Sequence, residues 1–170
     1  MRTLVVLVLT ATLQSTIAAQ ASDSWTVTLR HVGPIWFGMS IAQAEVALGE
    51  RFGRMEDEEC HYIRTSGMPA ALRLMVEGGR IVRADIDSSN IHTRSGAAVG
   101  VTETQVRALY PGKIRTEPHK YTGPEGHYLV YTPREVRDRR YRLVFETDGQ
   151  HVLNYRVGLR PAVEYVEGCS

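Results

Sequence analysis

Two glycine-flanked stretches are the first candidates for a binding site, because glycine-rich loops can cradle phosphate groups. They read GPIWFGMSIAQAEVALG from Gly33 to Gly49 and GAAVGVTETQVRALYPG from Gly96 to Gly112. A phosphate-binding loop needs G-x-x-x-x-G-K-[ST] or a strand-borne G-x-G-x-x-G, and neither pattern is present. The two stretches therefore favour a structural role over phosphate binding.

Other residues that carry chemistry lack the spacing that a site requires. The run from Asp85 to Asn90 offers oxygen ligands, but its twelfth position is Gly96, where an EF-hand calcium loop needs glutamate. The six histidines show no H-x-x-x-H or H-x-H spacing for zinc. A G-x-S-x-G elbow is absent, and the carboxylates of Glu164 and Glu167 come without a pocket signature. The sequence thus predicts no catalytic residue, no metal, no cofactor and no enzyme.

Cys60 and Cys169 are the two cysteines of the chain. In an oxidising compartment they can pair only with each other within the chain, closing a loop of about 110 residues worth up to ~4.7 kcal/mol. Two free thiols are the alternative. Because C-x-x-C is absent, redox catalysis is not indicated. We predict a disulfide that ties the segment YVEGCS to the first half of the chain.

The first 21 residues have the layout of a secretory signal peptide. Arg2 supplies the positive charge, an apolar run follows from Leu4 to Leu9, and small residues end at Ala21. The apolar run is too short and too interrupted by polar residues to span a bilayer. We predict cleavage after Ala21, with Ala19 as the second choice, and a periplasmic or secreted product. Ser22 stands where a lipoprotein would need cysteine.

The composition excludes one class of partner. The chain has 20 Lys and Arg against 19 Asp and Glu, so it has no global field that would attract nucleic acid or anionic lipid. About 150 residues remain after the leader, enough for one ordinary domain or two small units that share a core.

Each glycine-flanked stretch predicts a short capped helix. When Gly38 is aligned with Gly100, Ser40 matches Thr102 and Gln43 matches Gln105. A hydroxyl followed three residues later by glutamine is a capping box, which satisfies free backbone amides at a helix N-terminus. Each predicted helix covers about two and a half turns, too short to be stable without an apolar surface beneath it.

Strand patterns follow both helices. Apolar residues alternate with polar or small ones, and Gly78-Gly79 and Asp148-Gly149 are placed as hairpin turns. The six runs are CHYIRT, AALRLMV and RIVRADID after the first helix, then HYLVYT, YRLVFET and HVLNYRV after the second. WTVTLR, from Trp25 to Arg30, is an additional predicted strand. The fold class predicted is α+β, with two tandem helix-plus-antiparallel-meander repeats whose helices cover one face of the sheet.

The predicted domain boundaries follow from this repeat. Residues 1–21 are the signal peptide, and residues 22–90 form the first repeat with its N-terminal strand. Residues 91–170 form the second repeat and a C-terminal tail tethered by the disulfide. The linker SSNIHTRSG, from Ser88 to Gly96, separates the two repeats.

The repeat resembles the β-lactamase-inhibitor-protein-like (BLIP-like) fold, and it is similar to domains of outer-membrane assembly lipoproteins of the SmpA/OmlA type. The pattern is G-M-[ST] with a distal glycine, an aromatic strand, an apolar strand and a glycine hairpin. It is carried by Gly38, Met39, Ser40, Gly49, Tyr62, Leu74, Gly79 and Ile81, and again by Gly100, Val101, Thr102, Gly112, Tyr128, Phe145, Gly149 and Val152. The resemblance implies tandem α+β units that bind other proteins and leave one sheet face open. The missing lipidation cysteine and the single cysteine pair depart from that pattern.

Strand parity selects the residues of the open face. If Leu74, Leu143 and Phe145 face the helices, their neighbours point to the opposite side. Asp85 and Asp87 are then expected to face solvent, with Ile86 packed inward. The resulting candidate protein-binding face consists of Arg73, Arg83, Asp85, Tyr128, Val130, Arg142, Val144 and Arg156. Aromatic and arginine side chains are frequent in protein interfaces.

The function predicted from these features is an exported protein-binding module that inhibits or assists the assembly of a cell-envelope protein. The partner would be another protein, with no nucleic acid and no membrane span after cleavage. Alternatives from other classes are a periplasmic small-ligand-binding protein or hydrolase, and a structural component of the envelope.

Overall fold

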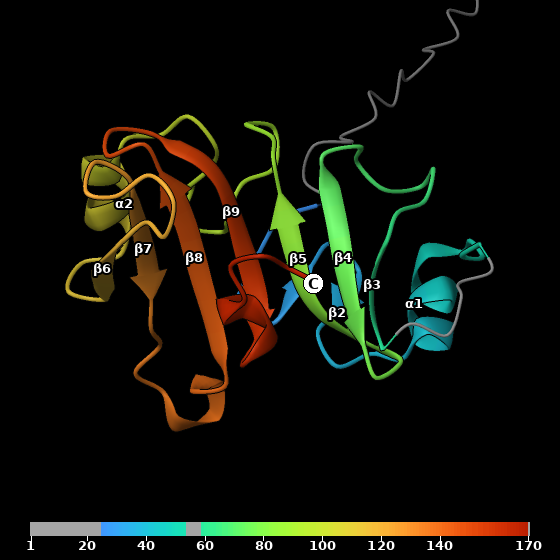
Figure 1. The fold of residues 1–170 in the computed structure, drawn as a ribbon. Coiled ribbons are helices and arrows are strands. Elements are labelled where there is room, and N and C mark those ends of the chain that lie inside the picture. The colour runs from blue at the N-terminus through green and yellow to red at the C-terminus, as the bar shows by residue number, and fades with distance from the viewer. Residues whose placement is uncertain (1–24, 54–58, 170) are drawn as a thin grey trace, which may run out of the picture.

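The computed structural model describes residues 25–53 and 59–169, and its centre is one seven-stranded antiparallel sheet (Figure 1). The strand order across the sheet is β3-β4-β5-β9-β8-β7-β6. The strands are β3 (Cys60–Ile63), β4 (Leu72–Glu77), β5 (Arg80–Ile86), β6 (Ile114–Pro118), β7 (His127–Tyr131), β8 (Tyr141–Thr147) and β9 (Val152–Leu159). The predicted signal peptide, residues 1–21, lies outside the described residues.

The fold class predicted from the sequence is wrong. The protein is mostly β, because one continuous sheet of seven strands is accompanied by two α-helices of eight and seven residues. The second half contributes four strands where a three-stranded meander was expected, since β6 was not predicted. In addition, β5 pairs with β9, so the halves form a single sheet in place of two helix-plus-meander repeats.

Both helices begin at the capping boxes predicted from the sequence. In α1 (Ile41–Leu48) the Ser40 hydroxyl accepts from the Gln43 amide, and the Gln43 side chain accepts from the Ser40 amide. In α2 (Glu103–Leu109) Thr102 and Gln105 make the same pair of contacts. Both predicted caps are confirmed. The sequence could predict them because a capping box depends only on residues three positions apart.

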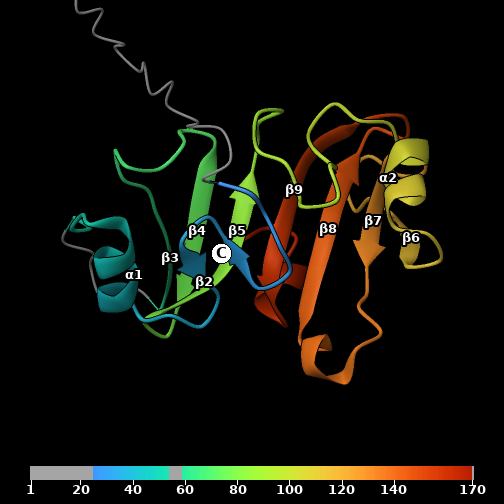
Figure 2. The same cartoon turned by 180° about the vertical axis from the view of Figure 1, so that it is seen from behind.

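A two-stranded hairpin, β1 (His31–Val32) with β2 (Ile35–Trp36), lies on the same face of the sheet as the helices (Figure 2). The strand predicted over residues 25–30 is wrong, since Val27 there forms only isolated bridges, to Val32 and Thr93. Gly33 turns the hairpin with a φ of 51°, a value that favours glycine at this position.

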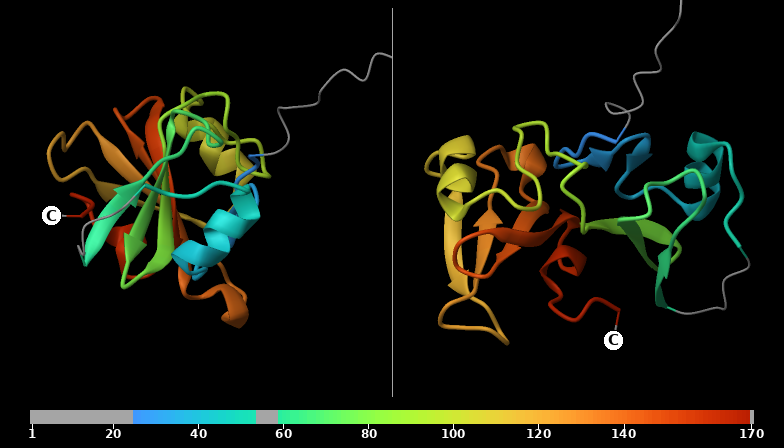
Figure 3. Two further views of the ribbon diagram at one scale, coloured as in Figure 1. Left: turned by 90° about the vertical axis from the view of Figure 1, so that its right-hand side faces the viewer. Right: turned by 90° about the horizontal axis from the view of Figure 1, so that it is seen from above.

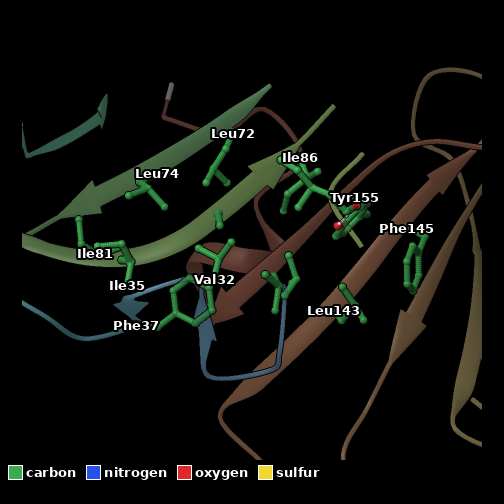
Figure 4. Packing of buried hydrophobic residues seen from close by; sticks show 14 of the residues in the cluster. Val32, Ile35, Phe37, Leu72, Leu74, Ile81, Ile86, Leu143, Phe145 and Tyr155 are labelled. Atoms are coloured by element: carbon green, nitrogen blue, oxygen red, sulfur yellow. Dashed lines mark hydrogen bonds between the residues drawn. The ribbon is translucent and has the colours of Figure 1, made fainter. Parts of the chain in front are cut away.

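The main core lies between the sheet and this hairpin. Figure 4 shows Val32, Ile35 and Phe37 directed at the sheet, opposite side chains of β4, β5, β8 and β9. Leu74 and Phe145 are fully buried in this core and Leu143 is nearly so, as expected from strand parity. The sheet therefore has its main apolar layer on the helix side.

The C-terminal segment, residues 160–169, lies on the opposite face of the sheet, over strands β5, β9, β8 and β7. Viewed from above, the helices and the hairpin lie on one side of the sheet and this segment lies on the other (Figure 3). It contains the short 3-10 helix η2 (Ala162–Glu164) and ends at the Cys60–Cys169 disulfide, which confirms the predicted pairing. None of the helices in the described part of the chain is long and apolar enough to cross a membrane.

Candidate binding site

The eight residues of the predicted binding face do lie on one side of the sheet. The strand register places Arg73, Asp85 and Arg156 next to one another across β4, β5 and β9. The same row continues through Val144 on β8 and Val130 on β7. Cross-strand neighbours point to the same face, so the parity used in the prediction holds here.

This face is not open to solvent, contrary to the expectation. Six of its eight residues are buried, and only two are partly exposed, Arg73 and Arg142. The buried six are Arg83, Asp85, Tyr128, Val130, Val144 and Arg156. The cause is the C-terminal segment, whose fully buried Val163 packs on Tyr128, Val130 and Val144.

Two buried arginines fasten this segment to the sheet. Arg83 donates to the carbonyl oxygens of Ala162 and Tyr165 at 3.1 and 2.7 Å, and Arg156 donates to that of Val163 at 2.8 Å. Arginine suits this role because its guanidinium presents several donors in a fixed plane. The predicted binding residues thus hold the protein's own chain.

Each of these arginines also has a carboxylate partner. Arg83 contacts Asp85 through Nε at 3.0 Å, and Arg156 pairs with Glu146. Burial lowers the pKa of Arg156, and the nearby charge of Arg83 lowers it further. Asp85 was expected to face solvent, and this is wrong because it is buried beneath the tail as the counter-ion of Arg83. Asp87 is exposed, as expected, and pairs with Arg73.

A hollow of about 750 Å³ lies beside the disulfide, between the tail and the turn that contains Lys120. Its polar groups already pair across it, with Lys120 Nζ 2.6 Å from a Glu167 oxygen and Tyr165 donating to Glu77 at 3.4 Å. Among the described residues, no group of three or more His, Cys, Asp or Glu is arranged to hold a metal ion.

A slot of about 330 Å³ opens on the helix side of the sheet, and sequence reasoning did not find it. It lies between the chain that enters β1, the loop after β5, the end of α2 and strands β7 and β8. It is lined by Val27, Thr28, Leu29, Arg30, His31, Trp36, Thr93, Arg94, Ser95, Tyr110, Tyr131 and Leu143.

The inner part of the slot is aromatic and apolar. Tyr110, at the C-terminus of α2, has its ring centroid 5.0 Å from that of Tyr131 on β7. Its hydroxyl donates to Thr93 Oγ1 at 2.8 Å, which fixes the ring between the loop and the sheet. Burial raises the pKa of Tyr110, although hydrogen bonds to Thr93 and Ser95 oppose the rise, so the phenol is neutral at physiological pH. Tyr110 therefore adds no charge to this side of the slot.

The outer wall is held by local and long-range contacts. The Thr28 hydroxyl accepts hydrogen bonds from the amides of Arg30 and His31, at 3.2 and 3.1 Å, and so turns the chain at Leu29. The Arg30 guanidinium then lies 2.6 Å from Asp138, in the 3-10 helix η1 (Val136–Asp138) between β7 and β8. The wall is thus tied to the β7–β8 loop.

Trp36 and Arg94 lie at the mouth of the slot. The Trp36 ring lies 4.6 Å from that of His31 and remains 48% exposed, which is unusual for so large an apolar side chain. Arg94 is exposed and makes no ion pair with any residue that the structure describes. The only sequence signal for this site was the clustering of Trp36 and His31 at a glycine turn.

The architecture is that of an antiparallel seven-stranded sheet with two short helices and a hairpin on one face and a disulfide-tethered segment on the other. A similar solved structure is the crystal structure of the uncharacterized protein yfeY from Escherichia coli, with 12% identity and a TM-score of 0.48. The alignment covers 79% of this chain and 99% of that one. No protein-family model matches the chain, and no curated protein matches it in sequence.

Proposed function

We propose that this chain is an exported protein-binding module, acting as an inhibitor or assembly factor of a cell-envelope protein, and that it binds through the slot beside Trp36. The observation that carries the proposal is a slot with an aromatic and apolar inner side and a half-exposed tryptophan at its mouth. Tryptophan and tyrosine that line a pocket are the residue types most often responsible for binding energy at protein interfaces.

The disulfide supports the exported part of the proposal. Stable disulfides persist mainly in oxidising compartments, and Cys60–Cys169 joins the sheet edge to the C-terminal segment. The signal-like first 21 residues support the same part of the proposal.

Photo-crosslinking tests the binding surface directly. A benzophenone amino acid would replace Trp36 in one variant and Leu153 in a control variant, and each protein would be incubated with a cell-envelope extract of the source organism. Leu153 is a matched control because it is 55% exposed and does not line the slot. We expect one dominant product from position 36, and none of that mass from position 153.

The product is then used to test affinity. With the crosslinked protein purified, calorimetry should show that Trp36→Ala weakens binding by about thirtyfold, the usual effect of removing an interface tryptophan worth about 2 kcal/mol. Leu153→Ala should leave affinity unchanged. Equal crosslinking from both positions, or full affinity of Trp36→Ala, would contradict the proposal.

The slot's volume also favours a second candidate, binding of a small ligand. A volume of about 330 Å³ lies at the lower end of the range of small-molecule pockets. Native mass spectrometry of protein purified from its own envelope would detect a retained ligand. A stoichiometric adduct that Trp36→Ala abolishes would favour this candidate over protein binding.

A further inference from the structure

The slot has an unequal charge lining. Arg30, His31 and Arg94 contribute to its walls, and no acidic residue does. Asp138 balances the charge of Arg30 from outside the slot. Arg94 has no such counter-ion among residues 25–53 and 59–169, so its charge is available to an anion at the mouth.

The two halves of the slot thus demand different chemistry of its occupant. The inner side, at Tyr110, Tyr131 and Leu143, suits an aromatic or aliphatic group, because burying apolar surface is favourable. The mouth, at Arg94, suits a carboxylate, which accepts charge-assisted hydrogen bonds from guanidinium.

The size of the slot limits how these two groups are connected. A volume of about 330 Å³ holds one large side chain, and it is too small for a helix or an extended strand. The smallest occupant that meets both demands is a single residue that carries the apolar group and the carboxylate together. In a protein, one residue carries both an apolar side chain and a carboxylate only at the C-terminus of a chain.

We infer that the slot binds the C-terminal residue of a partner protein, whose apolar side chain packs on Tyr110 and Tyr131 while its carboxylate pairs with Arg94. The inference rests on the proposed protein-binding function and names the part of the partner that is bound. Capture of a chain terminus by its carboxylate is a general mode of peptide recognition.

Peptide titration tests the inference. The probe is the tetrapeptide N-acetyl-Gly-Ser-Gly-Phe with a free C-terminal carboxylate, compared by calorimetry with the same peptide as its C-terminal amide. The protein is the purified chain with its disulfide intact. We expect the acid to bind about tenfold more tightly than the amide, a difference that corresponds to one solvent-accessible charged hydrogen bond.

Two variants show whether Arg94 causes the difference. Arg94→Gln should bind acid and amide equally, at the affinity that the amide has for the unaltered protein. Arg64→Gln is the control, because Arg64 is also exposed, has no ion pair within the described residues and is not part of the slot. It should keep the tenfold preference.

Each contrary outcome has its own meaning. Equal binding of acid and amide to the unaltered protein, or a preference that survives in Arg94→Gln, overturns the inference and leaves the proposed function standing. N-acetylphenylalanine should bind about as tightly as the tetrapeptide, because it carries the one residue that the slot holds; binding at least tenfold weaker would mean that residues before the terminal one make the contact, and the inference would fail. If no probe binds at millimolar concentration, the inference fails, and the crosslinking at position 36 decides separately whether the proposed function fails with it.

Discussion

Removing the disulfide should destabilise the protein chiefly through its unfolded state. Cys60 and Cys169 are 109 residues apart, and a loop of that length gives about 4.8 kcal/mol at 25 °C in the chain-entropy treatment. In the folded protein, the tail has further attachments, the hydrogen bonds from Arg83 and Arg156 and the buried Val163. We therefore expect the double variant Cys60→Ala, Cys169→Ala to fold with its tail in place, and to lose up to that amount of stability.

Urea denaturation followed by circular dichroism measures this loss. The slope of the unfolding free energy against urea should rise in the double variant, because an unfolded chain without the cross-link exposes more surface. Val163→Ala, made in both backgrounds, is the control for the tail. Val163→Ala should lower the free energy of unfolding by about 2 kcal/mol in each background, because it removes two buried methyl groups and leaves a cavity.

Two results would refute this reasoning. A loss below about 1 kcal/mol with an unchanged slope would mean that the cross-link does not restrict the unfolded chain. If Val163→Ala costs nothing in the double variant, the tail has left the sheet, and the hydrogen bonds from Arg83 and Arg156 are not enough to hold it.

Three further predictions concern the sheet and its ends. Arg156→Met should lower the free energy of unfolding in urea by about 3 kcal/mol, since it leaves the Oε1 oxygen of Glu146 and the Val163 carbonyl without their donor; a loss near zero would contradict the fastening role. Burial alone would raise the pKa of Glu103, but hydrogen bonds from Thr147 and His127 outweigh burial and lower that pKa below the usual 4.5. Ionised Glu103 therefore stabilises the fold above pH 4.5, and this stabilisation is lost as the pH falls through the pKa of the folded state. Glu103→Gln should therefore lose less stability than the unaltered protein between neutral and acidic pH in pH-dependent denaturation, and parallel curves would disprove this. Gly158→Ala should lower the free energy of unfolding by about 2 kcal/mol, because its Cβ would lie 2.3 Å from the Val82 carbonyl oxygen. Gly53→Ala, whose Cβ would have no atom of the described residues within 4 Å, should be nearly neutral in the same denaturation measurement.

Apart from the disulfide, which follows from there being two cysteines, the features that the sequence predicted correctly depend on near neighbours. The capping boxes at Ser40 and Thr102 need only residues three apart, and the Gly78-Gly79 turn joins adjacent strands β4 and β5. Strand β6 was missed because its sequence IRTEP ends in proline, which is disfavoured inside sheets and tolerated at an edge.

The features that were predicted wrongly depend on distant contacts. Pairing of β5 with β9 joins segments far apart in the sequence, and no local pattern indicates it. The predicted binding face was also wrong for this reason, although strand parity placed its residues on the correct side of each strand. Its burial is caused by Val163 and the tail, which parity does not address. The slot beside Trp36 is likewise assembled from five separate segments.

The pairing of β5 with β9 has a consequence for synthesis and for concentration-dependent assembly. Ile86 at the end of β5 pairs with Tyr155, so one edge of β5 stays unpaired until β9 has been made. An unpaired edge accepts any strand of matching register, including β9 of a second copy. Two copies that exchange their second halves would make the same seven-stranded sheets, joined through the connection after β5. We therefore expect domain-swapped dimers to form when chains are synthesised at high local concentration and β9 is made slowly.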